Sequence, residues 1–127
     1  MAQHVSPMIR ENYRTNLEYR ESVNARMLSL AKRLLSGELG IIAGARELSG
    51  FEDEVGQVEP EIGAVLTTFV GISSETDALP VGDERRHWSA AALEREDRKI
   101  AEAENTWRTN ALDACARLIS LIEASGV

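Results

Sequence analysis

The segment between Gly71 and Trp88, GISSETDALPVGDERRHW, crowds reactive side chains into eighteen residues. Its serines, carboxylates and single histidine are the side-chain types of a Ser-His-Asp hydrolase. No nucleophile-elbow or oxyanion-loop motif surrounds them in the sequence. The best enzymatic hypothesis therefore uses Glu75 and Asp77 as an acid and base pair beside His87, and it describes a small hydrolase or a ligand-binding protein.

Each residue type in this segment also has a structural role. Ser74 and Asp77 have the spacing of a capping box, which predicts that one helical turn begins at Ser74. Pro80 disfavours helical backbone at the residue before it, so we expect the turn to end there. Trp88 directly precedes Ser89, and serine is a frequent N-cap residue. We therefore favour a joint between two helices, and we assign no catalytic residue from the sequence.

Metal and nucleotide motifs are absent from the sequence. The two histidines, His4 and His87, and the one cysteine, Cys115, give no paired ligand spacing for zinc. The glycines of residues 37–50 do not match a P-loop, because no Gly-Lys-Ser/Thr follows them. They do not match a dinucleotide-binding fingerprint either, because no strand precedes them and their spacing differs. We therefore expect no metal and no cofactor. A single cysteine also excludes a disulfide within the chain.

The acidic residues are concentrated in the middle of the chain, whose formal net charge is −7. Residues 47–84 contain ten acidic residues and no Lys or Arg. This distribution disfavours direct binding of nucleic acid, which requires clustered basic residues to replace counterions. An acidic surface instead attracts a basic protein. Arg and Trp anchor many interfaces, so the basic and aromatic residues that directly follow this acidic segment are also candidates for partner contact. The candidate partner contacts are Glu52, Asp53, Glu54, Glu75, Asp77, Arg85, Arg86 and Trp88.

The spacing of apolar residues predicts an all-α fold in a single domain over residues 1–127. In the first and last thirds of the chain, apolar residues recur three or four positions apart, which is typical of a helix with one buried face. We expect two long helices, about 7–36 and 90–124, with shorter helices, about 39–49 and 60–71, packed across them. Residues 1–20 are more polar, and we expect them to project or to be partly ordered.

Local signals set these bounds. Ser6 and Pro7 have the types that begin a helix, and Gly37 has the type that ends one. Residues 62–70 are rich in β-branched side chains and also fit a strand, but no second segment suits a paired strand, so we expect a helix. Gly44 costs its helix about 1 kcal/mol relative to alanine, which is understandable where two helices cross closely.

The sequence shows no sign of membrane insertion or export. No segment has the apolar region of a signal peptide, and none approaches the roughly 18 apolar residues that span a bilayer. We therefore expect a cytoplasmic protein without membrane association. Aromatic residues make up 5% of the chain, so aliphatic side chains and alanine must form most of its core.

Several segments together resemble a family of short, uncharacterised bacterial proteins. They are RLLSGELGIIAGAREL, FVGISSETDALPVG and RRHWSAAALE, followed by a C-terminal helix that contains ACARLI, and they extend over about residues 27–122. The family shares a Ser-Glu-Thr-Asp-x-Leu-Pro core followed by a tryptophan. Since no activity is established for that family, the resemblance implies a bacterial cytoplasmic origin and assigns no catalytic residue.

The leading hypothesis from the sequence is a non-enzymatic protein-interaction module, of the kind that neutralises a toxin through an acidic surface. One alternative is the small hydrolase or ligand-binding protein that uses Glu75, Asp77 and His87. Another alternative is a helical subunit that forms a homodimer through an exposed apolar stripe.

Overall fold

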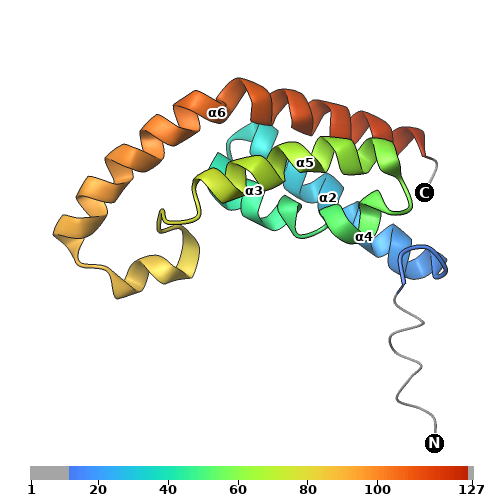
Figure 1. The fold of residues 1–127 in the computed structure, drawn as a ribbon, viewed down its shortest axis with the longest axis horizontal. Coiled ribbons are helices and arrows are strands. Elements are labelled where there is room, and N and C mark those ends of the chain that lie inside the picture. Colours follow the sequence, from blue (N-terminus) through green and yellow to red (C-terminus); the bar gives the residue numbers. More distant parts are fainter. Residues whose placement is uncertain (1–11, 126–127) are drawn as a thin grey trace, which may run out of the picture.

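The computed structural model describes residues 12–125 of the chain (Figure 1). These residues form helices and turns and contain no strand, so the prediction of an all-α fold is confirmed. Residues 62–70 are helical. The elements in chain order are α2 (Leu17–Ser36), α3 (Ile41–Ser49), α4 (Glu52–Gly56), α5 (Pro60–Glu75), the short 3-10 helix η1 (Gly82–His87) and α6 (Ala90–Ala124).

Side-chain and glycine caps fix both ends of α2. The side chain of Asn16 accepts a hydrogen bond from the backbone N–H of Tyr19 at 3.0 Å, so the helix begins at Leu17. Residues 13–15 form a turn, and the expected continuous helix over 7–36 is therefore wrong in its first part. The predicted start at residues 6–7 lies outside the described residues. Gly37 adopts a left-handed conformation with φ of 83° and ends the helix, as predicted.

The segments on either side of α5 differ from the sequence-based expectation. Residues 52–56 lie between the helices expected over 39–49 and 60–71, and they form a further helix, α4. Its first turn carries three acidic side chains at the helix end that favours negative charge. α5 continues to Glu75 instead of ending near residue 71, because Ile72 is fully buried and extends its apolar face. The predicted helix start at Ser74 is therefore wrong, since Ser74 lies inside the last turn of α5.

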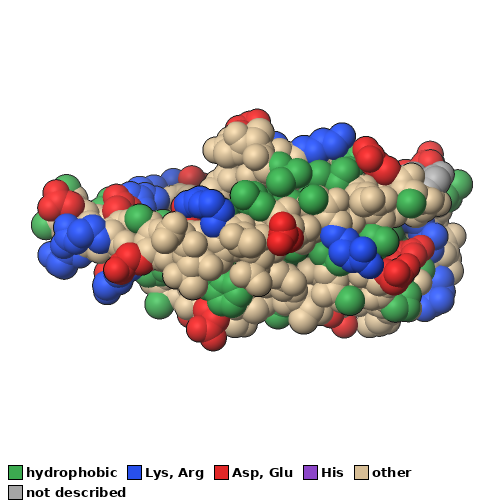
Figure 2. Space-filling view, turned by 90° about the horizontal axis from the view of Figure 1, so that it is seen from above, with side chains coloured by type: hydrophobic (Ala, Val, Ile, Leu, Met, Phe, Trp, Pro, Cys, Tyr) green, Lys and Arg blue, Asp and Glu red, His purple; other side chains and the backbone are tan. Residues whose placement is uncertain are grey.

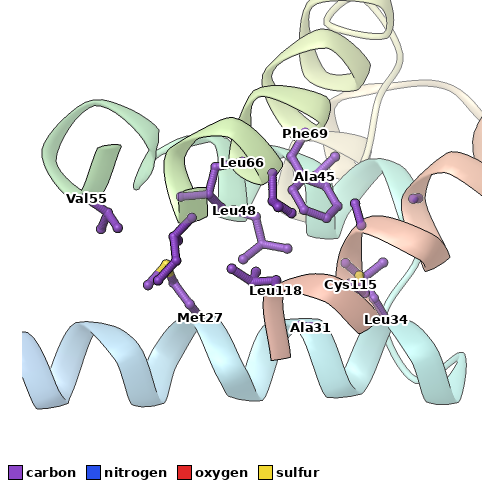
Figure 3. Close-up of a cluster of buried hydrophobic side chains, with 14 of the residues drawn as sticks. Met27, Ala31, Leu34, Ala45, Leu48, Val55, Leu66, Phe69, Cys115 and Leu118 are labelled. Atoms are coloured by element: carbon purple, nitrogen blue, oxygen red, sulfur yellow. The ribbon is translucent and has the colours of Figure 1, made fainter. Parts of the chain in front are cut away.

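Four helices, α2, α3, α5 and α6, enclose the core, and α4 closes one end (Figures 1 and 3). The core is mostly aliphatic, in keeping with the low aromatic content. The buried side chains that meet in Figure 3 come from all five of these helices and include Met27, Ala31, Leu34, Ala45, Leu48, Val55, Leu66, Phe69, Cys115 and Leu118.

Two glycines allow the helices to approach closely. A Cβ atom on Gly44 of α3 would lie 2.6 Å from the Leu34 side chain of α2, which confirms the expected close crossing at this residue. A Cβ atom on Gly63 of α5 would lie 2.6 Å from the Cα atom of Gly56 in α4. Because that neighbour is backbone, it cannot move aside as a side chain can, so α4 and α5 require glycine at this contact.

The first half of α6 extends beyond the four-helix body (Figure 1). α6 has 35 residues and α5 has 16, which corresponds to about 52 Å and about 24 Å of helix. The fully buried residues of α6 begin only at Ala111. We call residues 82–105, which comprise η1 and the first half of α6, the arm. Among the helices of residues 12–125, none combines the length and apolar character needed to cross a membrane.

Candidate functional site

Arg46, in the last turn of α3, fixes the loop that leads from α5 to the arm. Its Nη2 atom donates to the carbonyl oxygens of Thr76 at 2.7 Å and Leu79 at 2.6 Å. Its Nη1 atom donates to Oε1 of Glu84 at 3.1 Å. The planar guanidinium can hold several acceptors at once, which an ammonium group does less well. One side chain of α3 therefore connects three positions of the loop and η1.

Glu84 links this arginine to the start of η1. Its Oε1 atom also accepts a hydrogen bond from the backbone N–H of Val81 at 2.9 Å. This backbone hydrogen bond, followed by the hydrogen bond from Arg46, holds the pKa of the Glu84 carboxyl below its ordinary value. Gly82, between Val81 and the body of η1, has φ of 66°, a conformation that favours glycine. The charged carboxylate thus stabilises the entry to the arm.

Thr76 anchors the same loop in the core. It is 3% exposed, and its hydroxyl donates to the Ile72 carbonyl oxygen at 2.7 Å. Its own carbonyl oxygen accepts from the backbone N–H of Leu79 at 3.0 Å in addition to Arg46. Pro80 is fully buried. The Thr76 and Pro80 positions of the Ser-Glu-Thr-Asp-x-Leu-Pro segment therefore have structural roles, whereas Glu75 and Asp77 point to solvent.

Arg85 connects η1 to α6 through hydrogen bonds and so stabilises the arm. Its Nη1 and Nη2 atoms donate to Oδ1 and Oδ2 of Asp97 at 2.7 and 3.1 Å, a bidentate pair. Nη1 also reaches the Pro80 carbonyl oxygen at 3.3 Å. The hydrogen bonds from Arg85 lower the pKa of the Asp97 carboxyl, and those to Asp97 raise the pKa of the Arg85 guanidinium. Arg85, a candidate for partner contact, is thus used within the chain.

The end of the arm presents an exposed aromatic residue. Trp88 lies between η1 and α6 and is 39% exposed. Arg86 and His87 beside it are exposed, as is Asp83 at the start of η1. The side chains of Asp83, Arg86 and His87 form no hydrogen bond or ion pair with any part of residues 12–125. We call the exposed residues Asp83, Arg86, His87 and Trp88 the arm tip.

The acidic candidates fall into two separate groups. Glu52, Asp53 and Glu54 lie on α4, before the start of α5, while Glu75 and Asp77 lie at its other end. The 16-residue helix between the groups is about 24 Å long. Residues 47–84 therefore do not form one continuous acidic surface.

Basic residues from other segments also form ion pairs with some of these acidic side chains. Arg20 lies 4.0 Å from Glu59, Arg117 lies 3.8 Å from Glu61, and Arg46 binds Glu84. Glu54 accepts a hydrogen bond from the Tyr19 hydroxyl at 3.0 Å. The acidic side chains left exposed and without such pairs near the arm are Glu75, Asp77 and Asp83.

The residues of the hydrolase alternative are all exposed. Glu75, Asp77 and His87 lie on the last turn of α5, on the following turn and at the end of η1, respectively. Glu84 and His87 have the Glu-x-x-His spacing of carboxylate-bridged metal proteins, but Glu84 is held by Arg46. Within the described part of the chain, no three His, Cys, Asp or Glu side chains lie close enough together to bind a metal ion.

Four residues of this site are missing from the sequence-based candidates: Arg46, Thr76, Glu84 and Asp97. One feature of the sequence pointed to Arg46. It is the last basic residue before a 38-residue segment with ten acidic residues, and some of that negative charge must be balanced by a nearby base. Thr76 and Asp97 had no such feature, since a buried threonine and a surface aspartate have ordinary sequence contexts.

Comparison with family models, with curated proteins and with solved structures gives no match to this chain. The resemblance to the bacterial family therefore stays a prediction.

Proposed function

We propose that this chain is a protein-interaction module that binds its partner through the arm tip. The observation that carries the proposal is the exposure of Trp88 at the end of an arm that is braced internally and contributes little to the core. Tryptophan is one of the three residue types, with tyrosine and arginine, that are enriched among interface hot spots. An arm held by Arg46 and Arg85 presents it with little loss of conformational entropy on binding.

The charge around the arm tip favours a basic partner. Glu75, Asp77 and Asp83 are exposed near the tip, and the chain as a whole carries −7. Such a field accelerates association with a positively charged protein and weakens at high salt. A basic toxin that this module neutralises in a bacterial cytoplasm is the partner class we expect. The exposure of Glu75, Asp77 and His87 supports this proposal over the hydrolase alternative, which requires a water-excluding site.

The test uses the immobilised chain to capture proteins from its native host at low salt, followed by identification, purification and titration of the captured protein. We expect a basic partner whose affinity falls at least about 30-fold for Trp88→Ala, the loss typical of a hot spot. The double variant Asp77→Asn/Asp83→Asn reduces the association rate and its salt dependence. Leu35→Glu, on a different face of the molecule, serves as the charge-adding control. Equal binding by Trp88→Ala and the unaltered chain would overturn the proposal.

A further inference from the structure

The side chain of Glu104 joins the first half of α6 to the four-helix body. Its Oε2 atom accepts a hydrogen bond from the backbone N–H of Ile42, in the first turn of α3, at 3.3 Å. Among residues 12–125, no other hydrogen bond or ion pair connects residues 90–105 of α6 to helices α2 to α5. Figure 2, which views the molecule from the side of α6, shows the arm as a narrow extension with acidic and basic side chains along it. Glu104 therefore marks the point where the arm leaves the body.

Glu104 also supplies the N-terminal cap that α3 itself lacks. Gly40 is the N-cap residue of α3 and has no side chain to accept a hydrogen bond, and the first turn of α3 contains no acidic residue. A carboxylate at a helix N-terminus satisfies a free N–H and interacts favourably with the helix dipole. A Cβ atom on Gly40 would lie 3.1 Å from Oε2 of Glu104, although the φ of −66° at this residue suits any amino acid. Glycine at this position thus leaves room for the carboxylate of α6.

The arm is consequently attached to both ends of α3. Arg46, in the last turn of α3, holds the loop and η1, and Ile42, in the first turn, holds Glu104. We propose that α3 fixes the direction of the arm through these two attachments, with Glu104 as the positioning residue on the α6 side. The inference rests on the proposed function, because the arm tip that Glu104 positions is the proposed partner site.

The length of the arm amplifies any movement at Glu104. The helix from Ala90 to Glu104 is about 21 Å long, so a tilt of about 15° at its base moves the arm tip by about 5 Å. The fully buried residues of α6 begin only at Ala111, so little apolar packing opposes such a tilt. Without Glu104, the attachment through Arg46 holds one side of the arm and the arm pivots there. The position of Trp88 therefore depends on the hydrogen bond at the base of the arm.

The test measures the distance between spin labels on Arg86→Cys at the arm tip and Ser29→Cys on α2, in the full chain without a partner. Both positions are exposed, whereas Cys115 is fully buried and stays unlabelled. We expect one narrow distance distribution in the labelled chain and a distribution about 5 Å wider after Glu104→Ala. The matched control is Glu102→Ala, which removes an exposed carboxylate from the same helix and leaves the distribution narrow.

A double variant separates positioning of the arm from capping of α3. In Gly40→Ser/Glu104→Ala, the serine at the N-cap position caps α3 from within its own chain segment. We expect chemical denaturation to show that the stability lost in Glu104→Ala is recovered, while the distance distribution stays wide. A narrow distribution in Glu104→Ala overturns the inference, and so does one that the serine restores, because Glu104 would then act as a cap alone. Circular dichroism checks that each variant keeps its helices.

Partner binding tests the same inference at the level of function. A loose arm must be ordered again on association, so we expect Glu104→Ala to weaken binding of the captured partner about five-fold. The label distances are measured in the chain alone and do not depend on a partner. A chain that captures no partner therefore contradicts the proposed function, whereas a narrow distribution in Glu104→Ala contradicts only this inference.

Discussion

Arg85 of η1 donates hydrogen bonds to both carboxylate oxygens of Asp97 in α6, at 2.7 and 3.1 Å, and thereby connects the two elements of the arm. The pair lies outside the four-helix core, where the first half of α6 has no fully buried residue. An unsupported helical segment of this length is marginal in water. The order of the arm therefore depends on polar contacts to an unusual degree, and these contacts respond to pH and to single substitutions.

Acidification should loosen the arm before the core. The folded-state pKa values of Asp97 and Glu84 lie below their ordinary values of 3.8 and 4.5. A depressed folded-state pKa adds stability that is present above the unfolded-state pKa and is lost as pH falls through the folded-state value. We expect Asp97→Asn to increase amide exchange in η1 at neutral pH, relative to the unaltered chain. Well below pH 3.8 this difference disappears. A difference that persists there would contradict the assignment, and Glu94→Gln is the control on the same helix.

Arg46 should contribute more to stability than an ordinary surface arginine. Its side chain is 23% exposed, and its guanidinium donates to two backbone carbonyl oxygens as well as to Glu84. Arg46→Met removes all three of these hydrogen bonds, and we expect the free energy of unfolding to fall by about 2 kcal/mol. Arg46→Lys recovers only part of this loss, because lysine lacks the planar fork.

Arg33→Met provides the comparison for Arg46. Arg33 pairs with Glu38 at 3.0 Å on the exposed surface, and removal of such a pair changes stability by about 0–1 kcal/mol. Chemical denaturation of the three variants measures the differences. Similar losses for Arg33→Met and Arg46→Met would show that Arg46 is not the connector of the loop.

The two glycines of α5 should respond to alanine with opposite signs. A Cβ atom on Gly63 would lie 2.6 Å from the Gly56 backbone, whereas a Cβ atom on Gly71 would meet nothing within 4 Å. Gly63→Ala therefore destabilises the fold by about 1–3 kcal/mol through overpacking. Gly71→Ala stabilises it by up to about 1 kcal/mol, because alanine is the better helix former. Thermal unfolding of both variants checks the signs, and a stabilised Gly63→Ala would refute the close approach of α4 and α5.

Cys115 should resist modification in the folded protein. The thiol is fully buried, and burial raises its pKa to about 11, so the reactive thiolate is scarce at neutral pH. We expect alkylation to be limited by unfolding and to become fast in denaturant. Introduction of an exposed thiol by Ala116→Cys gives an internal standard, since it reacts at once while Cys115 stays intact. Rapid modification of two thiols in that folded variant would contradict the burial.

Sequence patterns predicted the long helices better than the segments that connect them. The bounds of α6 match the expected 90–124 because Ser89 caps the helix, its side chain accepting from the Ala92 N–H at 3.1 Å. The end of α2 at Gly37 was likewise predicted from a local signal. The last turn of α5 was missed because Ser74 resembles a cap, and only the burial of Ile72 keeps the helix going. The candidate site was predicted in part: Trp88 is exposed as an anchor should be, but Arg85 is used inside the chain.

By itself, the sequence determined that the chain has four main helices, α2, α3, α5 and α6, where most of their ends lie, and that their core is aliphatic. Those properties depend on neighbours within about four residues, through backbone propensity, capping and the 3.6-residue period. Only the tertiary structure decided that Arg46 holds Thr76, Leu79 and Glu84, at sequence separations of 30 to 38 residues. It also decided that α5 separates the acidic residues into two groups. Such contacts depend on how helices cross and on which side chains then meet, and no local preference encodes either.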